Sequence, residues 1–442
     1  MLSSKLAFKQ LLLFALPIIA GHLGIVLIGT GDMVIAGHYS SECLAAIGLA
    51  VAIANPIMIS LLGLQFSISP VLAQKRGRGE DISEYFFSVL LYTFFVSLIS
   101  CILTYVSSYF VSYFGYSENV TRIIIDYLRI TSFSAFGLCL YQGLKEYLQS
   151  QEKTLASNLI AIIAVGVNLF MNYGLVFGKF GLPQLHEVGL AWASFGVRAF
   201  MALGLFLLTI KLLKKKLVIK WDFIKEVFTL GTPIAFTLFF EIMAFCSVTL
   251  FVGKFGEIQS AANNIALNIG SLAFMVPMSI GAAVSVKIGH AYGERNFPLI
   301  RIFSKVALLF ALAFAVLTCL VFSFLPDTLV ALFTSDQQVL EWGSRLLFYV
   351  ACFQFFDGAQ VTQAGILRGL NITRAASIAV FIGYWIIGIP IGYYLGFIQN
   401  FEAIGFWQGL TISLAVVAVM LGLVLKKALK NVQQESSHVP SM

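Results

Sequence analysis

The sequence predicts an all-α membrane protein with twelve transmembrane helices in two six-helix bundles, an N-lobe and a C-lobe, around a central cavity. Three observations predict this fold class: the composition, a series of apolar segments of membrane-spanning length, and a repeat of the first half in the second. Of the 442 residues, 59% are hydrophobic and 11% are charged, against about 25% charged in an average soluble domain. Soluble enzymes and cytosolic binding modules are therefore excluded.

The apolar segments have the length that a membrane requires. A bilayer core about 30 Å thick is crossed by roughly 20 apolar helical residues. Several segments are longer, which indicates tilt or helix beyond the lipid. The first segment is too long for a cleavable signal peptide and contains Asp32, and the segments lack the alternation of a β-barrel. The expected spans are 9–37, 44–73, 83–113, 120–149, 155–178, 188–212, 224–252, 258–290, 299–325, 337–367, 374–397 and 402–426.

The basic residues predict the orientation of these spans. One set of alternate connecting segments contains 22 of the 28 Lys and Arg residues, and the other set contains 5. The positive-inside rule then places both termini and the 211–225 segment of this multi-pass protein on the cytoplasmic side of the membrane. The net charge of +7 is a topology signal, so no nucleic-acid partner is expected. The six cysteines form no CxxC pair and are expected to be buried apolar residues.

The two halves of the sequence repeat. When the sequence is aligned with itself at an offset of 216 residues, Pro17 aligns with Pro233 and Gly37 aligns with Gly253. Six spans per half is an even number, so the halves share one membrane orientation, and a cavity between them suits alternating access. We expect a monomer. The expected organisation is an N-terminal lobe at 1–213, a cytoplasmic linker at 214–223, a C-terminal lobe at 224–430 and a polar tail at 431–442.

Three acids lie well inside the apolar spans: Asp32, Glu241 and Asp357. A charged side chain at the centre of a membrane helix costs about 2.5–3.5 kcal/mol on insertion scales. Such residues are functional candidates by default. The alternatives are an ion pair with a distant Lys or Arg for Glu241 and Asp357, and a position facing water or capping a neighbouring helix for Asp32.

Polar residues accompany each acid. Asn168 and Asn172 share one helix face in the N-terminal half and are candidate partners of Asp32. A cluster of carboxylate and amide oxygens can hold a hard cation such as Na⁺, whereas a carboxyl group taken out of water can carry a proton. Both ions remain open. The polar residues near the C-terminal acids, which could converge on them, are Thr237, Asn263, Asn264, Asn268, Gln354 and Gln360.

Several segments of the sequence resemble a known family, the multidrug and toxic compound extrusion (MATE) transporters, in their NorM-like bacterial branch. The segment ALPIIAGHLGIVLIGTGDMVIAGHYSSECLAAIGLA resembles the family's first span and loop, and AANNIALNIGSLAFMVPMSIGAAVSVKIGHAYG resembles its eighth span. FFDGAQVTQAGILRG and YWIIGIPIGYYLG are similar to its tenth and eleventh spans. The resemblance covers nearly the whole chain, with these motifs in the family's order.

The resemblance implies a two-lobe exporter of organic cations that exchanges them for Na⁺ or H⁺. It implies that Asp32 is the acid of an N-lobe cation site, with Asn168 and Asn172 as its partners. Ser194 stands where a Thr is common in this site. Glu241 and Asp357 match the acidic pair of the C-lobe site.

Two departures from the family pattern affect the C-lobe. Asn263 and Asn264 stand where relatives often have His-Gln, which removes a titratable histidine. Phe353 stands one turn before Asp357, where some relatives have Tyr. The lost hydroxyl is expected to weaken or reshape the C-lobe site.

Cation-coupled antiport of small organic cations is therefore the leading hypothesis. The chain contains no GxxxxGK[ST], HExxH or GxSxG motif, so an ATP-driven pump and the corresponding enzymes are disfavoured and no cofactor is expected. The alternative is a flippase for lipids or lipid-linked precursors, which would favour basic residues in its cavity. A receptor would not need the repeat.

Overall fold

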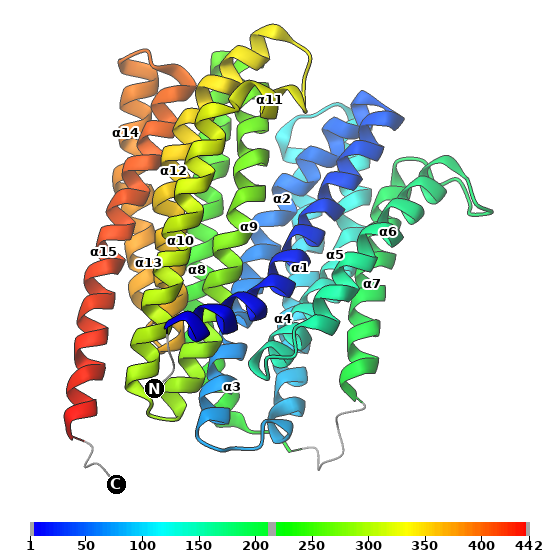
Figure 1. The fold of residues 1–442 in the computed structure, drawn as a ribbon. Coiled ribbons are helices and arrows are strands. Elements are labelled where there is room, and N and C mark those ends of the chain that lie inside the picture. Colours follow the sequence, from blue (N-terminus) through cyan, green and yellow to red (C-terminus); the bar gives the residue numbers. More distant parts are fainter. Residues whose placement is uncertain (1–3, 211–217, 439–442) are drawn as a thin grey trace. The chain divides into compact units, whose positions relative to one another are not determined.

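The computed structural model describes residues 4–210 and 218–438, and every regular element in these ranges is a helix (Figure 1). The elements of the first half and the start of the second are α1 (Ser4–Tyr39), α2 (Ser41–Gln65), α3 (Ile68–Gly77), η1 (Ile82–Tyr85), α4 (Phe86–Ser107), η2 (Ser108–Phe114), α5 (Glu118–Ser150), α6 (Leu155–Phe177), α7 (Val188–Ile210) and α8 (Trp221–Val252). They are followed by η3 (Gly253–Phe255), α9 (Glu257–Gly293), α10 (Phe297–Phe324), α11 (Pro326–Ala331), α12 (Gln337–Gly369), α13 (Arg374–Phe381), η4 (Ile382–Gly388), α14 (Ile389–Tyr393), η5 (Tyr394–Ile398) and α15 (Glu402–His438).

Eleven helical segments in the described ranges are long and apolar enough to cross a membrane. They correspond to all the expected spans except the tenth. That span forms α12, which has 33 residues but is less apolar because it contains Glu341, Arg345, Asp357 and several glutamines. The expected number of long helices is therefore present, and the least apolar of them contains one of the candidate acids.

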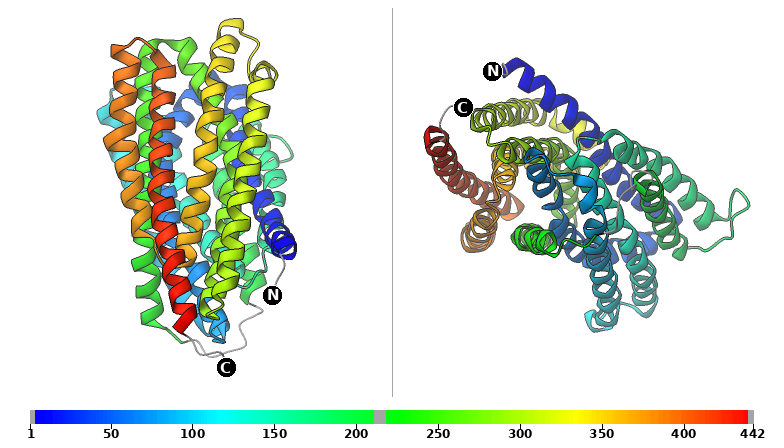
Figure 2. Two further views of the ribbon diagram at one scale, coloured as in Figure 1. Left: turned by 60° about the vertical axis from the view of Figure 1, so that its left-hand side comes forward. Right: turned by 90° about the horizontal axis from the view of Figure 1, so that it is seen from below.

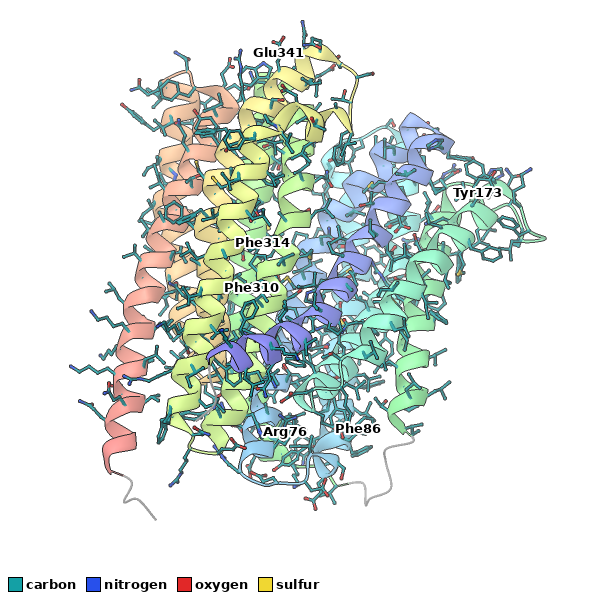
Figure 3. All side chains as sticks on the ribbon, viewed as in Figure 1. Arg76, Phe86, Tyr173, Phe310, Phe314 and Glu341 are labelled. Atoms are coloured by element: carbon teal, nitrogen blue, oxygen red, sulfur yellow. The ribbon has the colours of Figure 1, made fainter. Side chains whose placement is uncertain are left out.

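Contacts divide the chain into two compact units. Unit 2 comprises Leu16–Ala235, and unit 1 combines the chain up to Ala15 with the chain from Phe236 onward. In each unit the long helices lie side by side along a common direction (Figure 2). Figure 3 shows that Arg76 and Phe86 lie at one end of unit 2, whereas Tyr173 lies towards the other end.

These units differ from the expected lobes, 1–213 and 224–430, at the first helix of each half. The start of α1 groups with unit 1, where Phe8 contacts Phe310 with ring centroids 5.8 Å apart. The start of α8 groups with unit 2, where Ser67 Oγ donates to Val227 O at 2.8 Å. Both unit boundaries lie near prolines that the repeat relates, Pro17 and Pro233. Proline removes a helical hydrogen bond, so a helix bends there and its two parts can follow different neighbours.

Several boundaries differ from those expected. The second span is divided into α2 and α3, and the short helix α11 follows α10 where no separate element was expected. The eleventh span contains two π-helices, η4 and η5. The expected polar tail at 431–442 is helical as far as α15 extends, and part of the expected linker at 214–223 lies outside the described residues. All six cysteines are free, as expected, but Cys101, Cys246, Cys319 and Cys352 are only partly buried.

Candidate functional site

The structure brings together the four residues expected to form the N-lobe site. Asp32 lies in α1 and is buried in unit 2. Its Oδ1 accepts hydrogen bonds from Asn168 Nδ2 at 2.8 Å and from Asn172 Nδ2 at 2.7 Å. Its Oδ2 accepts a hydrogen bond from Ser194 Oγ at 2.9 Å. Residues from α1, α6 and α7 thus hold both carboxylate oxygens, and Ser194 occupies a position where a threonine is common in the family.

The local sequence explains this arrangement. Asn168 and Asn172 are four residues apart on α6, so both amides lie on the same helix face. Gly31 precedes Asp32, and a Cβ at this glycine would lie 2.9 Å from Asn168 Oδ1. The missing side chain lets α1 approach α6 closely at the level of the acid. A glycine beside the acid therefore has a packing role in this site.

The charge of Asp32 has no direct ionic partner. Within the described ranges, no Lys, Arg or His lies at ion-pair distance from it. Arg198 is within electrostatic range, but its Nη1 donates to Ser134 Oγ at 2.9 Å. The three donors to the carboxylate are neutral. Asn168 Oδ1 and Asn172 Oδ1 are also buried and accept no hydrogen bond, so two amide oxygens are available to a cation beside a carboxylate.

A second group of acids lies in unit 1. Glu241 in α8 and Asp357 in α12 lie within electrostatic range of each other, and the Tyr384 hydroxyl of η4 lies within electrostatic range of both. Asp357 and Tyr384 are buried. Asp357 Oδ1 and the Tyr384 hydroxyl have no hydrogen-bond partner that meets the usual geometry. Two carboxyl groups thus share an apolar environment with an unsatisfied hydroxyl.

The other polar residues of unit 1 are distributed differently from the expectation. Asn264 and Asn268 lie exposed on α9, and Asn268 Nδ2 donates to Asn264 O at 2.9 Å, within the same helix. The buried Asn263 accepts a hydrogen bond from Trp407 Nε1 at 2.9 Å. Asn263 thus contacts α15, whereas Asn264 and Asn268 share the exposed face of α9.

Three further polar residues of the expected set lie on α8 and α12. Thr237 is buried on α8, one turn before Glu241. Gln354 Nε2 donates to Gly270 O at 2.6 Å, so this amide joins α12 to the backbone of α9. Gln360 is buried, and its Oε1 has no hydrogen-bond partner. Of these residues, Gln360 retains an oxygen that could serve a ligand.

Sequence reasoning did not identify Tyr384. Phe353, which stands where some relatives have tyrosine, is buried against Phe245 and Trp407, with ring centroids 5.7 Å and 5.6 Å away. The hydroxyl near the acids comes instead from Tyr384, on a different helix. The sequence YWIIGIPIGYYLG contains three tyrosines, and nothing in its spacing distinguishes the one that faces the acids. The π-helical backbone of η4, frequent at functional sites, was also not predictable from this spacing.

Lys145, which the charge pattern assigns to the cytoplasmic set, lies near the C-terminal end of α5 and is only 1% exposed. Its Nζ has no hydrogen-bond partner, and the ammonium lies within electrostatic range of His22. Unit 2 therefore contains a further ionisable side chain, the buried Lys145, in addition to Asp32 and Arg198.

Comparison with known proteins identifies the family. The MatE family model matches this chain twice, at residues 17–174 and 233–394. The two matches begin at Pro17 and Pro233, the prolines that the internal repeat relates. The chain belongs to the MatE family.

Relatives of this MatE chain include NorM and MdtK proteins of bacteria. It is 30% identical over 436 residues to the multidrug resistance protein NorM of Photobacterium profundum, with 95% of each chain covered. It is 32% identical over 430 residues to NorM of Vibrio cholerae, with 94% of each chain covered. The resemblance stated from the motifs, including the NorM-like branch, is confirmed.

Solved structures agree on the fold. The crystal structure of a eukaryotic MATE transporter, AtDTX14, matches with a TM-score of 0.87 at 20% sequence identity, covering 97% of this chain and 98% of that chain. The predicted fold class is therefore confirmed. The family is that of MATE transporters and not of enzymes, and this chain is a multi-pass membrane protein.

Proposed function

We propose that this chain is a secondary active multidrug exporter. It exchanges organic, often cationic, compounds for Na⁺ or H⁺ by alternating access, as a monomer in the inner membrane of a bacterium with both termini in the cytoplasm. The observation that carries the proposal is the Asp32 carboxylate, which is buried among three neutral donors beside two unsatisfied amide oxygens. An acid without an ionic partner inside a membrane helix marks an ion or proton pathway by default.

The relatives support export as the direction of transport. Full-length relatives at about 30% identity are multidrug resistance proteins by name. The acids Glu241 and Asp357 make the interior of unit 1 negative as well, which suits cationic cargo. One elementary charge moving through 100 mV contributes about 2.3 kcal/mol, or roughly a fifty-fold concentration gradient.

The site residues divide into two proposed groups. In unit 2 the coupling ion binds Asp32, with Asn168, Asn172 and Ser194 as its supporting ligands or donors. In unit 1 it binds at Glu241 and Asp357, and Tyr384 supplies the hydroxyl. Na⁺ suits the carboxylate, amide and hydroxyl oxygens of both groups, and a proton suits a carboxyl without an ionic partner.

The test is transport by purified protein in proteoliposomes. Ethidium movement is measured under an isolated Na⁺ gradient and under an isolated proton gradient, with Asp32→Asn, Glu241→Gln and Asp357→Asn beside the wild type. We expect one gradient to drive wild-type transport and at least one acid variant to abolish it. Wild-type rates in all three variants would contradict the coupling role of these acids.

The buried Lys145 favours one second candidate, a flippase for lipids or lipid-linked precursors, because an interior ammonium suits an anionic head group. The same vesicles distinguish it. Translocation of a fluorescent phospholipid without movement of ethidium would replace the export proposal with this one.

A further inference from the structure

Arg129 of α5 lies in an unusual setting on unit 2. Its guanidinium lies over the rings of Tyr105 and Tyr109, at 6.0 Å and 5.7 Å from their centroids. Its Nε is buried and has no hydrogen-bond partner. Asp126 is three residues away on the same helix, yet no acid in the described part of unit 2 forms an ion pair with Arg129. The positive charge is therefore not neutralised by a carboxylate.

The surface around Arg129 is apolar. The exposed side chains include Ile102 and Val106 of α4 and Phe133 of α5. α4 and α5 both belong to segments of membrane-spanning length and apolarity, so these side chains face lipid. An arginine in such surroundings is costly unless its head group reaches the interface and finds an anion there.

The element η2, which joins α4 to α5, has the character of a membrane interface. Four aromatic residues of η2 are exposed, Tyr113 by 86%. Tyrosine is enriched where the hydrocarbon meets the head groups. These rings place the end of α4 at the depth of the lipid phosphates, within reach of the long Arg129 side chain.

The second half of the chain has a related arrangement, in which the arginine is exposed and its aromatic partner lies on the same helix. Arg345 of α12 stands 216 residues after Arg129, the offset of the internal repeat, and its guanidinium lies 5.8 Å from the Trp342 ring centroid. The short helix α11 corresponds to η2. Leu332, at the C-terminal end of α11, is 76% exposed, and Phe324 before it is 77% exposed. Glu341 precedes Arg345 by four residues, and no ion pair joins them in the described part of unit 1.

We propose that Arg129 and Arg345 each bind the phosphate of a membrane phospholipid, one site in each repeat. A guanidinium presents parallel N–H donors that match two phosphate oxygens, and the neighbouring aromatic rings contact the glycerol and upper acyl region. The exposed apolar surface requires that the phosphate carry acyl chains. This inference is independent of the proposed transport function. The basic loop charges predict that both sites lie in the outer leaflet.

The test is native mass spectrometry of the full-length protein in detergent, titrated with palmitoyl-oleoyl phosphatidylglycerol. A diacylglycerol with the same acyl chains is the phosphate-free probe. We expect Arg129→Gln and Arg345→Gln each to weaken the binding of one phosphatidylglycerol molecule by about tenfold or more, as for loss of a hydrogen bond to a charged group. The double variant is expected to lose both.

The matched control is Arg301→Gln, which removes an exposed charge near the start of α10, at the end of that helix away from α11. Arg301 donates to Gln433 Oε1, and its replacement is expected to leave lipid binding unchanged. Arg129→Lys keeps the charge without the planar fork, so it is expected to bind more weakly than the wild type and more tightly than Arg129→Gln.

Three results would overturn the proposal. Undiminished phosphatidylglycerol binding by the double variant would show that other residues hold the lipid. Equal retention of the diacylglycerol would show an apolar contact without phosphate recognition. Displacement of the lipid by excess inorganic phosphate would show a site for a soluble anion. The diacylglycerol and inorganic phosphate comparisons use wild-type protein, so they test phospholipid recognition even where a variant does not fold.

Discussion

At the scale of single residues, the site in unit 2 depends on neutral groups that hold a negative one. Two amides and one hydroxyl satisfy the Asp32 carboxylate, and hydrogen bonds to a charged group contribute more than bonds between neutral groups. The amide oxygens that remain unsatisfied are the ligands that we propose for a cation.

The Asp32→Asn variant tests this site. The amide has nearly the same shape as the carboxyl group but cannot exchange a proton or neutralise Na⁺. We expect gradient-driven ethidium transport to fall by at least about tenfold, the effect of one lost charged interaction, while the protein remains monodisperse in gel filtration. Asp222→Asn is the control, because Asp222 is exposed at the start of α8. Equal losses in both variants would point to a general effect of charge.

Tyr384 allows a second test at this scale. Its hydroxyl lies near Glu241 and Asp357, so Tyr384→Phe removes an oxygen ligand or donor while keeping the ring. We expect half-maximal transport to require about tenfold more of the coupling ion, equivalent to one hydrogen bond to a charged group. The exposed Tyr393 of α14 provides the matched Tyr393→Phe control. An unchanged ion dependence in Tyr384→Phe would exclude the hydroxyl from the site.

At the scale of elements, glycines determine how closely helices approach in unit 1. A Cβ at Gly365 of α12 would lie 2.3 Å from Gly281 O of α9. Two backbones can approach so closely only where the side chain is absent, as in other membrane helix pairs. This contact sets the position of α12, and with it the position of Asp357 two turns away.

The Gly365→Ala variant should therefore destabilise unit 1. A methyl group forced against backbone costs about 1–3 kcal/mol, as in other overpacked cores. We expect a melting temperature in detergent lower by several degrees. Gly166→Ala is the control, since a Cβ at Gly166 of α6 would meet nothing within 4 Å; it is expected to be neutral or slightly stabilising. Equal melting temperatures for the two variants would mean that the α9–α12 approach can relax.

Most elements could be predicted from sequence because apolar length is a strong signal for a membrane helix. The elements that were missed have weak local signals. These elements are α11 and η2, which are short, whereas α12 was expected as the tenth span. In the segment that contains the π-helix η4, Gly383 and Gly388 lie against Ser413 of α15. A contact between residues so far apart cannot be read from the local sequence.

At the scale of the whole molecule, charge and repetition define the organisation. The MatE family model matches each half once, in agreement with the offset found from prolines and glycines. The unit boundaries near Pro17 and Pro233 show the same symmetry. Duplication of a bundle whose first helix bends at this proline accounts for the matching positions of the two unit boundaries.

The predicted orientation can be tested by cysteine labelling. In a variant without the six native cysteines, Lys179→Cys and Lys430→Cys place single thiols at exposed positions after α6 and near the end of α15. We expect a membrane-impermeant maleimide to label Lys179→Cys in intact cells, and Lys430→Cys only after permeabilisation, because of the positive-inside rule. The reverse pattern would invert the proposed topology.

The sequence alone determined the class of protein, the long helices, the repeat and the three acids, because hydropathy, charge and residue periodicity are local properties of the chain. The family motifs added Ser194 to the expected partners of Asp32. Only the tertiary structure decided which polar groups meet. It joined α1, α6 and α7 around Asp32 and placed Tyr384 beside the acids of unit 1. It also turned Asn264 and Asn268 to the exposed face of α9 and buried Lys145. These contacts join residues far apart along the chain, and their geometry depends on how whole helices pack.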